Sequence, residues 1–121
     1  MTDDTSMPEI GTEAERSEIQ GRIEEIHSTL SGMRYLSSGN LQKRYKRCGN
    51  PNCRCAKDPD ARHGPYFEWS YMKGGKLRHR SLTAQQADAM TVAIENFHKV
   101  KRLLKTWEQQ TLQLIGVSPS K

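Results

Sequence analysis

The sequence predicts an α+β fold in which a small three-stranded antiparallel sheet lies between an N-terminal helix and a long C-terminal helix. Three observations predict this order: heptad-spaced apolar residues in both flanking regions, an alternating aromatic run at residues 66–72, and a Gly-Gly pair just after that run. The chain has 121 residues and a mean hydropathy of −0.86. A single domain this short and polar has a thin core, so we expect a metal or a partner subunit to stabilise it.

The N-terminal helix is predicted over residues 12–38, after a disordered tail at residues 1–11 that shows no periodicity. Thr12 and Glu15 form a capping-box pattern, in which each side chain accepts from the other residue's backbone amide. The following apolar residues recur at steps of four and three, which gives one narrow face for packing against another helix. They are Ile19, Ile23, Ile26, Leu30 and Met33. Ser31 and Gly32 weaken the last turns, and residues 37–40 end the helix.

Residues 39–82 are predicted to form the sheet. The strands are expected at residues 41–47, 66–72 and 76–82, and the Gly-Gly pair at residues 74–75 permits a tight hairpin turn. Side chains alternate along a strand, so Lys76, Arg78 and Arg80 share one face of the last strand. Phe67, Trp69 and Tyr71 also share a face, which we expect to form the core of the sheet against the helices.

A second capping box at residues 83–86 begins the C-terminal helix, predicted over residues 83–116 and followed by a short tail at 117–121. Its apolar stripe continues the spacing of three and four through Met90, Ala93, Phe97, Val100, Leu104, Trp107, Thr111 and Leu114. At 1.5 Å per residue such a helix is about 48 Å long, more than a small sheet can cover. We therefore expect coiled-coil packing, either in a homodimer held by the helices or within one chain.

The three cysteines lie within eight residues, at Cys48, Cys53 and Cys55, and His63 follows eight positions after the last. Thiolates and imidazoles are preferred Zn²⁺ ligands, and a structural site needs four, so we predict a structural zinc held by these residues. Asp58, Asp60 or His79 could replace His63 as the fourth ligand. Three reduced thiols without metal are the alternative, whereas an odd cysteine count and no secretory signal argue against disulfides.

The positive charge is concentrated in the middle of the chain. Residues 37–80 carry eleven Lys or Arg against three Asp or Glu, a balance of +8, whereas residues 1–36 have a balance of −5. Such a basic region is typical of a surface that binds polyanions, and we predict nucleic-acid binding, with DNA favoured over RNA. The predicted contact residues are Lys43, Arg44, Lys46, Arg47, Arg54, Lys76, Arg78 and Arg80.

The competing class is a non-catalytic adaptor whose heptad helices bind a protein partner. An enzyme is not expected, because the chain contains no nucleophile elbow, phosphate-binding loop or deaminase zinc motif. No stretch is apolar for long enough to span a membrane, and no targeting segment is evident, so a cytoplasmic protein is expected.

Several of these elements together resemble an uncharacterised family of small bacterial and phage proteins. Its members share a basic strand, C-G-x-P-x-C-x-C, H-G-P-Y, a Gly-Gly hairpin and a long helix with I-E-N-[FY]. Here these are residues 41–55, 63–66, 74–75 and 94–97, so the resemblance covers roughly residues 38–108. It implies no activity. The function we predict is a zinc-stabilised DNA-binding accessory protein, for example one that serves a mobile element.

Overall fold

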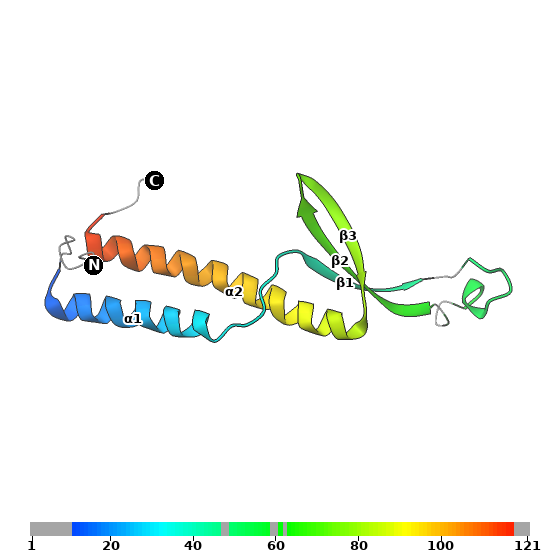
Figure 1. Cartoon of the computed structure of the whole chain (residues 1–121), viewed down its shortest axis with the longest axis horizontal. Helices are drawn as coiled ribbons and strands as arrows, with labels where there is room; N and C mark the ends of the chain where they lie inside the picture. The colour runs from blue at the N-terminus through cyan, green and yellow to red at the C-terminus, as the bar shows by residue number, and fades with distance from the viewer. Residues whose placement is uncertain (1–10, 47–48, 59–60, 62, 118–121) are drawn as a thin grey trace. The chain divides into compact units, whose positions relative to one another are not determined.

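The computed structural model describes residues 11–46, 49–58, 61 and 63–117, and only the backbone of Cys55. Its elements follow in the order α1, β1, η2, β2, β3 and α2 (Figure 1). The predicted order of a helix, a three-stranded antiparallel sheet and a long helix is confirmed. Apart from residues 11 and 117, the predicted tails lie outside the described residues. The chain forms two compact units, a sheet unit of residues 35–97 and a helical unit of residues 1–34 with 98–121.

Helix α1 spans Glu13–Ser31, and the capping box predicted at its start is confirmed. The Thr12 hydroxyl accepts from the Glu15 amide at 3.1 Å, and the Glu15 carboxylate accepts from the Thr12 amide at 2.9 Å. The bond from the Thr12 backbone, followed by the one from its side chain, lowers the pKa of Glu15. The capping interaction is therefore complete while Glu15 is ionised, and it is lost as the pH falls through that lowered pKa.

The predicted C-terminal boundary of this helix, residue 38, is wrong. The Gly32 amide donates to the Thr29 carbonyl at 3.2 Å and the Met33 amide to the Leu30 carbonyl at 3.1 Å. These bonds, three residues back, tighten the last turn and replace the four-residue pattern of the helix. Met33, the last residue of the predicted heptad stripe, therefore lies beyond the end of the helix.

In the helical unit, α1 lies beside the second half of α2 (Figure 1). Arg22 donates to the side-chain carbonyl of Gln110 at 3.1 Å, and the ring of His27 meets the Trp107 ring edge-on at 4.5 Å between centroids. Among the described residues of this unit, the buried apolar ones are Ile19, Ile26 and Leu114, all members of the predicted stripes. The helices are therefore in contact through the apolar faces that the heptad spacing predicts.

Helix α2 spans Ala84–Ile115, and its predicted capping box is also confirmed: Thr83 and Gln86 exchange bonds of 2.9 and 3.1 Å. Gly116, with a φ of +83°, ends the helix, and the amides of residues 116 and 117 both donate to the Leu112 carbonyl. Within the described part of the chain, neither this helix nor α1 has the length and apolarity needed to cross a membrane.

The segment that leads from α1 into the sheet is held against the first half of α2, inside the sheet unit. The Ser37 amide donates to the Ala93 carbonyl at 3.1 Å, and the Asn96 side chain donates to the Tyr35 carbonyl at 2.8 Å. Asn96 belongs to the I-E-N-F motif, so one residue of that motif has a structural role: it fixes the chain before the first strand.

The sheet consists of β1 (Asn40–Lys46), β2 (His63–Lys73) and β3 (Lys76–Leu82), in the order β1-β2-β3 with antiparallel pairing throughout. Strand β2 starts three residues before the predicted run and pairs with both neighbours. The hairpin at Gly74 and Gly75 is confirmed, and both glycines have positive φ, as a two-residue turn of this kind requires.

The aromatic residues Phe67, Trp69 and Tyr71 are half-buried in the structure, and none is fully buried, in contrast to the enclosed core expected for this face. In the part of the sheet unit that the structure describes, the fully buried apolar residues are Ala87 and Ala93. The Trp69 indole is nonetheless fixed, because its N–H donates to the Ser38 carbonyl at 2.9 Å. Main-chain pairing and such bonds therefore position this face more than a deep apolar core does.

Gly39 makes room for that indole, and we predict that Gly39→Ala destabilises the sheet. A Cβ there would lie 2.4 Å from Trp69 Nε1 and 2.5 Å from the Ser70 carbonyl oxygen, at a φ of +106°. The loss should be at least about 2 kcal/mol, measured by urea unfolding followed by circular dichroism.

The matched control is Gly21→Ala in α1, where a Cβ meets nothing within 4 Å. This change should stabilise the protein by about 0.5–1 kcal/mol, because alanine favours a helix over glycine. Equal effects of the two substitutions would contradict the packing described for Gly39.

Candidate metal site and cationic sheet face

The chain around Cys53 is a succession of tight turns. The Cys53 amide donates to the Asn50 carbonyl at 3.0 Å, and the Asn50 side chain accepts from the Asn52 amide at 2.9 Å. The short 3₁₀ helix η2 (Arg54–Ala56) follows at once, with the Ala56 amide donating to the Cys53 carbonyl. Asparagine side chains commonly accept hydrogen bonds from backbone amides in such turns. Hydrogen bonds of this kind, and not burial of apolar side chains, hold this segment together.

Two of the four predicted zinc ligands meet at the end of the sheet. Cys53 Sγ lies 3.1 Å from His63 Nε2, and His63 is the first residue of β2, paired with Lys46 of β1. Typical zinc bond lengths in a tetrahedral site place a sulfur and a nitrogen ligand about 3.6 Å apart. The observed pair is therefore close to metal-binding geometry and would need to open by only a fraction of an ångström.

The other two predicted ligands, Cys48 and the side chain of Cys55, lie outside the described residues, as does the alternative ligand Asp60. Among the residues that are described, no three His, Cys, Asp or Glu side chains gather in a way that could hold a metal. Zinc binding therefore stays a prediction, supported by the Cys53–His63 contact.

His79, considered as a replacement for His63, is excluded by its position in the sheet. It lies on β3 opposite Ser70, and its Nδ1 is 2.8 Å from the Ser70 hydroxyl. Ser70 is seven residues along β2 from His63, which corresponds to about 23 Å of extended strand. Asp58, the remaining described alternative, has its carboxylate 3.5 Å from Arg54.

Strand alternation and register assign the residues of the sheet to two faces. Residues opposite each other in antiparallel strands share a face, and every second residue of a strand does so too. One face, called the cationic face here, carries Leu41, Lys43, Phe67, Trp69, Tyr71, Lys73, Lys76, Arg78, Arg80 and Leu82. The opposite face, called the polar face, carries Asn40, Gln42, Arg44, Glu68, Ser70, Met72, Leu77 and His79.

The structure thus divides the predicted nucleic-acid contacts. Lys43, Lys76, Arg78 and Arg80 lie together on the cationic face, whereas Arg44 lies on the other side of β1. Lys46 follows a register shift in β1, and its ammonium lies 5.6 Å from the centroid of the Tyr66 ring. Arg54 lies in η2, directly after Cys53 and 3.5 Å from Asp58, so it belongs to no strand, and Arg47 is outside the described residues. Lys43 and Arg44 of β1 therefore do not belong to one continuous basic surface. The prediction missed Lys73, although alternation from Phe67 along β2 already places it on this face.

The five cations of the cationic face are not neutralised locally. They are Lys43, Lys73, Lys76, Arg78 and Arg80, and all five are exposed. Glu68 is the only acidic residue in the three strands, and it lies on the polar face, 3.6 Å from Arg44 and 3.9 Å from His79. Within the described ranges, none of the five forms an ion pair.

A family profile with the description "Domain of unknown function (DUF6788)" matches residues 16–91, which is 76 of the 121 residues. The chain belongs to this family. The match covers most of α1, the whole sheet and the first quarter of α2, so it begins earlier and ends earlier than the resemblance inferred from motifs. No curated protein and no solved structure matches the chain.

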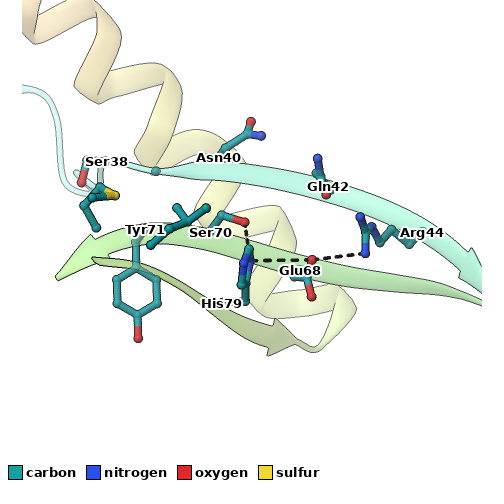
Figure 2. Close-up of a pocket in the computed structure, with 11 residues that line it drawn as sticks. Ser38, Asn40, Gln42, Arg44, Glu68, Ser70, Tyr71 and His79 are labelled. Carbon is teal, nitrogen blue, oxygen red and sulfur yellow. Dashed lines mark hydrogen bonds and ion pairs between the residues drawn. The ribbon is translucent and has the colours of Figure 1, made fainter. Parts of the chain in front are cut away.

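The polar face of this DUF6788 member is hollowed to a volume of about 760 Å³ beside Ser70 and His79 (Figure 2). Figure 2 shows Ser70, His79, Glu68 and Arg44 linked in a row across the three strands. Both Ser70 and Glu68 approach the same nitrogen of His79, Nδ1. A Ser–His–carboxylate relay needs the two partners on opposite ring nitrogens, so this row does not have the geometry of a nucleophilic triad.

Metal analysis tests the Cys53–His63 pair. We predict about one equivalent of zinc in protein purified without chelators, and loss of the metal in Cys53→Ser and in His63→Gln. His79→Gln is the matched control, since that histidine lies on the sheet away from the pair, and it should keep the metal. Fully folded protein that contains no metal would refute the zinc prediction.

Proposed function

We propose that the protein binds nucleic acid through the cationic face of the sheet, and that a zinc ion fixes the Cys53–His63 end of the same sheet. One observation carries the first part: five exposed cations share that face, and the strands contain no carboxylate on it. Phosphates attract such a surface strongly, because binding releases the counterions condensed on the polyanion. Solubility alone does not require that Glu68, the only carboxylate of the strands, lies on the face opposite the five cations.

The order of the strands supports a specific set of contacts. Arg78 and Arg80 lie on edge strand β3, and Lys43 lies on edge strand β1, with β2 between them. Cations at both edges of one face can hold a polynucleotide that runs across the sheet. Lys73 and Lys76 flank the Gly-Gly turn and pair directly with each other, which extends the positive charge to the hairpin end.

Salt dependence tests this proposal. The log of the affinity should fall linearly with log salt, with a slope near −0.9 per phosphate neutralised on a duplex and near −0.7 on a single strand. The double variant Arg78→Glu and Arg80→Glu should weaken binding to all sequences. It should also make the slope on a duplex less steep by about 1.8, the value for two lost phosphate contacts.

The matched control reverses the same number of charges on α2, at Lys99 and Arg102, which are both exposed. It should change the affinity far less. Equal losses in the two double variants would mean diffuse attraction to a positive protein, and no binding even at low salt would refute the proposal.

Protein–protein association through the helices is a second candidate, as a homodimer or with another protein. One observation favours it: Leu104 keeps 49% of its surface exposed and lines a hollow of about 380 Å³ along α2, together with Trp107, Thr111, Leu112 and the charged Glu108. These residues belong to or adjoin the predicted heptad stripe, and two helices alone leave part of such a stripe open. A second copy of the chain is the partner that this apolar strip fits.

Light scattering at micromolar concentration tests the dimer. The wild-type protein should have twice the mass of the chain, and Leu104→Asp should be monomeric because a charge enters the apolar strip. Gln109→Asp, at an exposed position of the same helix, serves as the control and should remain dimeric. A monomeric wild-type protein would contradict association of the helices between chains.

A further inference from the structure

Two aromatic rings lie in the middle of the cationic face. Trp69 and Tyr71 stack with their centroids 4.2 Å apart and their planes at 17°. Both side chains are partly exposed, and Tyr71 also borders the hollow in Figure 2, where its ring points away from His79 and Ser70. The bond from the indole to the Ser38 carbonyl holds the pair in place.

Each of the two aromatic residues lies opposite an arginine of β3. Arg80 is the register partner of Trp69, and Arg78 is the register partner of Tyr71. An arginine therefore flanks each aromatic residue on the same face of the sheet. Aromatic rings interleaved with cations in this way present a flat apolar surface and a phosphate-binding charge side by side.

A stacking surface of this kind distinguishes between forms of nucleic acid. In a duplex both faces of each base are covered by neighbouring bases, so a protein ring can stack only where the duplex is opened at a cost of a few kcal/mol. Unpaired bases offer their faces freely, and base–aromatic stacking tolerates any sequence.

We propose that the ligand of the cationic face is single-stranded nucleic acid, with bases stacked on the Trp69–Tyr71 pair and phosphates held by Arg78, Arg80 and the neighbouring lysines. This inference rests on the proposed function and specifies its ligand. DNA and RNA single strands share the recognised chemistry, and separate arms of the test distinguish them.

Tryptophan fluorescence provides the test. The chain has two tryptophans, so Trp107→Phe leaves Trp69 as the only one. Titration of this full-length variant with oligodeoxyuridine and oligouridine of about 12 nucleotides, which differ only in the 2′-hydroxyl, should quench the emission to saturation. The matching duplexes should bind at least about tenfold more weakly at the same salt concentration, because their bases are already stacked.

Tyrosine variants test whether the Trp69–Tyr71 pair is the stacking surface. Tyr71→Leu should weaken single-strand binding by roughly 5- to 150-fold, the range that corresponds to losing one stacked base, whereas Tyr71→Phe keeps the ring and the affinity. Tyr66→Leu is the matched control, because Tyr66 is an exposed tyrosine that pairs with Arg44 and lies outside the stacked pair. It should bind like the parent protein. Circular dichroism of each variant shows whether the sheet is folded, and Tyr71→Phe keeps the test valid if Tyr71→Leu is not.

The outcomes separate this inference from the proposed function. No binding of any oligonucleotide overturns both. Equal binding of single strands and duplexes with a steep salt slope, without quenching of Trp69, leaves nucleic-acid binding standing and overturns the single-strand inference. Quenching by one oligonucleotide and not the other supports it and identifies the sugar that is preferred.

Discussion

Strand β2 hydrogen-bonds to β1 along one edge and to β3 along the other, and its alternation decides what each face of the sheet presents. Odd-numbered residues from Phe67 to Lys73 point to one side with the register-matched cations of both neighbours. Even-numbered residues point to the other side, and Glu68 goes with them. Because few side chains are fully buried, it is this main-chain pairing that keeps the cations on the face opposite Glu68. A register shift of one residue would bring Glu68 onto the cationic face and neutralise part of it.

Local patterns predicted most of the fold. The two capping boxes, the Gly-Gly hairpin and the heptad-spaced residues all depend on neighbours in sequence, and each occurs where the pattern indicates. Alternation along the last strand also groups Arg78 and Arg80 on one face, as the pairing with β2 confirms. The exception is the end of α1, where Ser31 and Gly32 stop the helix although the apolar spacing continues to Met33. The apolar periodicity does not take helix propensity into account. Ser31 and Gly32 are weak helix formers, and together they outweigh the one further apolar residue, Met33.

Strand register and contacts between residues distant in the sequence could not be predicted from local patterns. Lys43 and Arg44 are adjacent members of one basic cluster, yet adjacent residues of a strand face opposite sides, and only the register with β2 shows which one joins the arginines of β3. The role of Asn96 in holding the Tyr35 carbonyl depends on a contact 61 residues apart in sequence. The half-burial of Trp69 was missed for a similar reason, since an aromatic strand face is more often covered by helices. The Cys53–His63 contact, by contrast, was predictable because both ends belong to metal-binding residue types.

The central claim is that this sheet face, with its aromatic pair, is where nucleic acid binds. Ultraviolet cross-linking of the wild-type protein to an unmodified single-stranded oligonucleotide, followed by peptide mass spectrometry, tests it most directly, since aromatic side chains stacked on bases cross-link readily at zero distance. The account predicts cross-links on β2, at Trp69 or Tyr71. Cross-links confined to α2, or to Tyr45 and Tyr66 with none on the stacked pair, would contradict it.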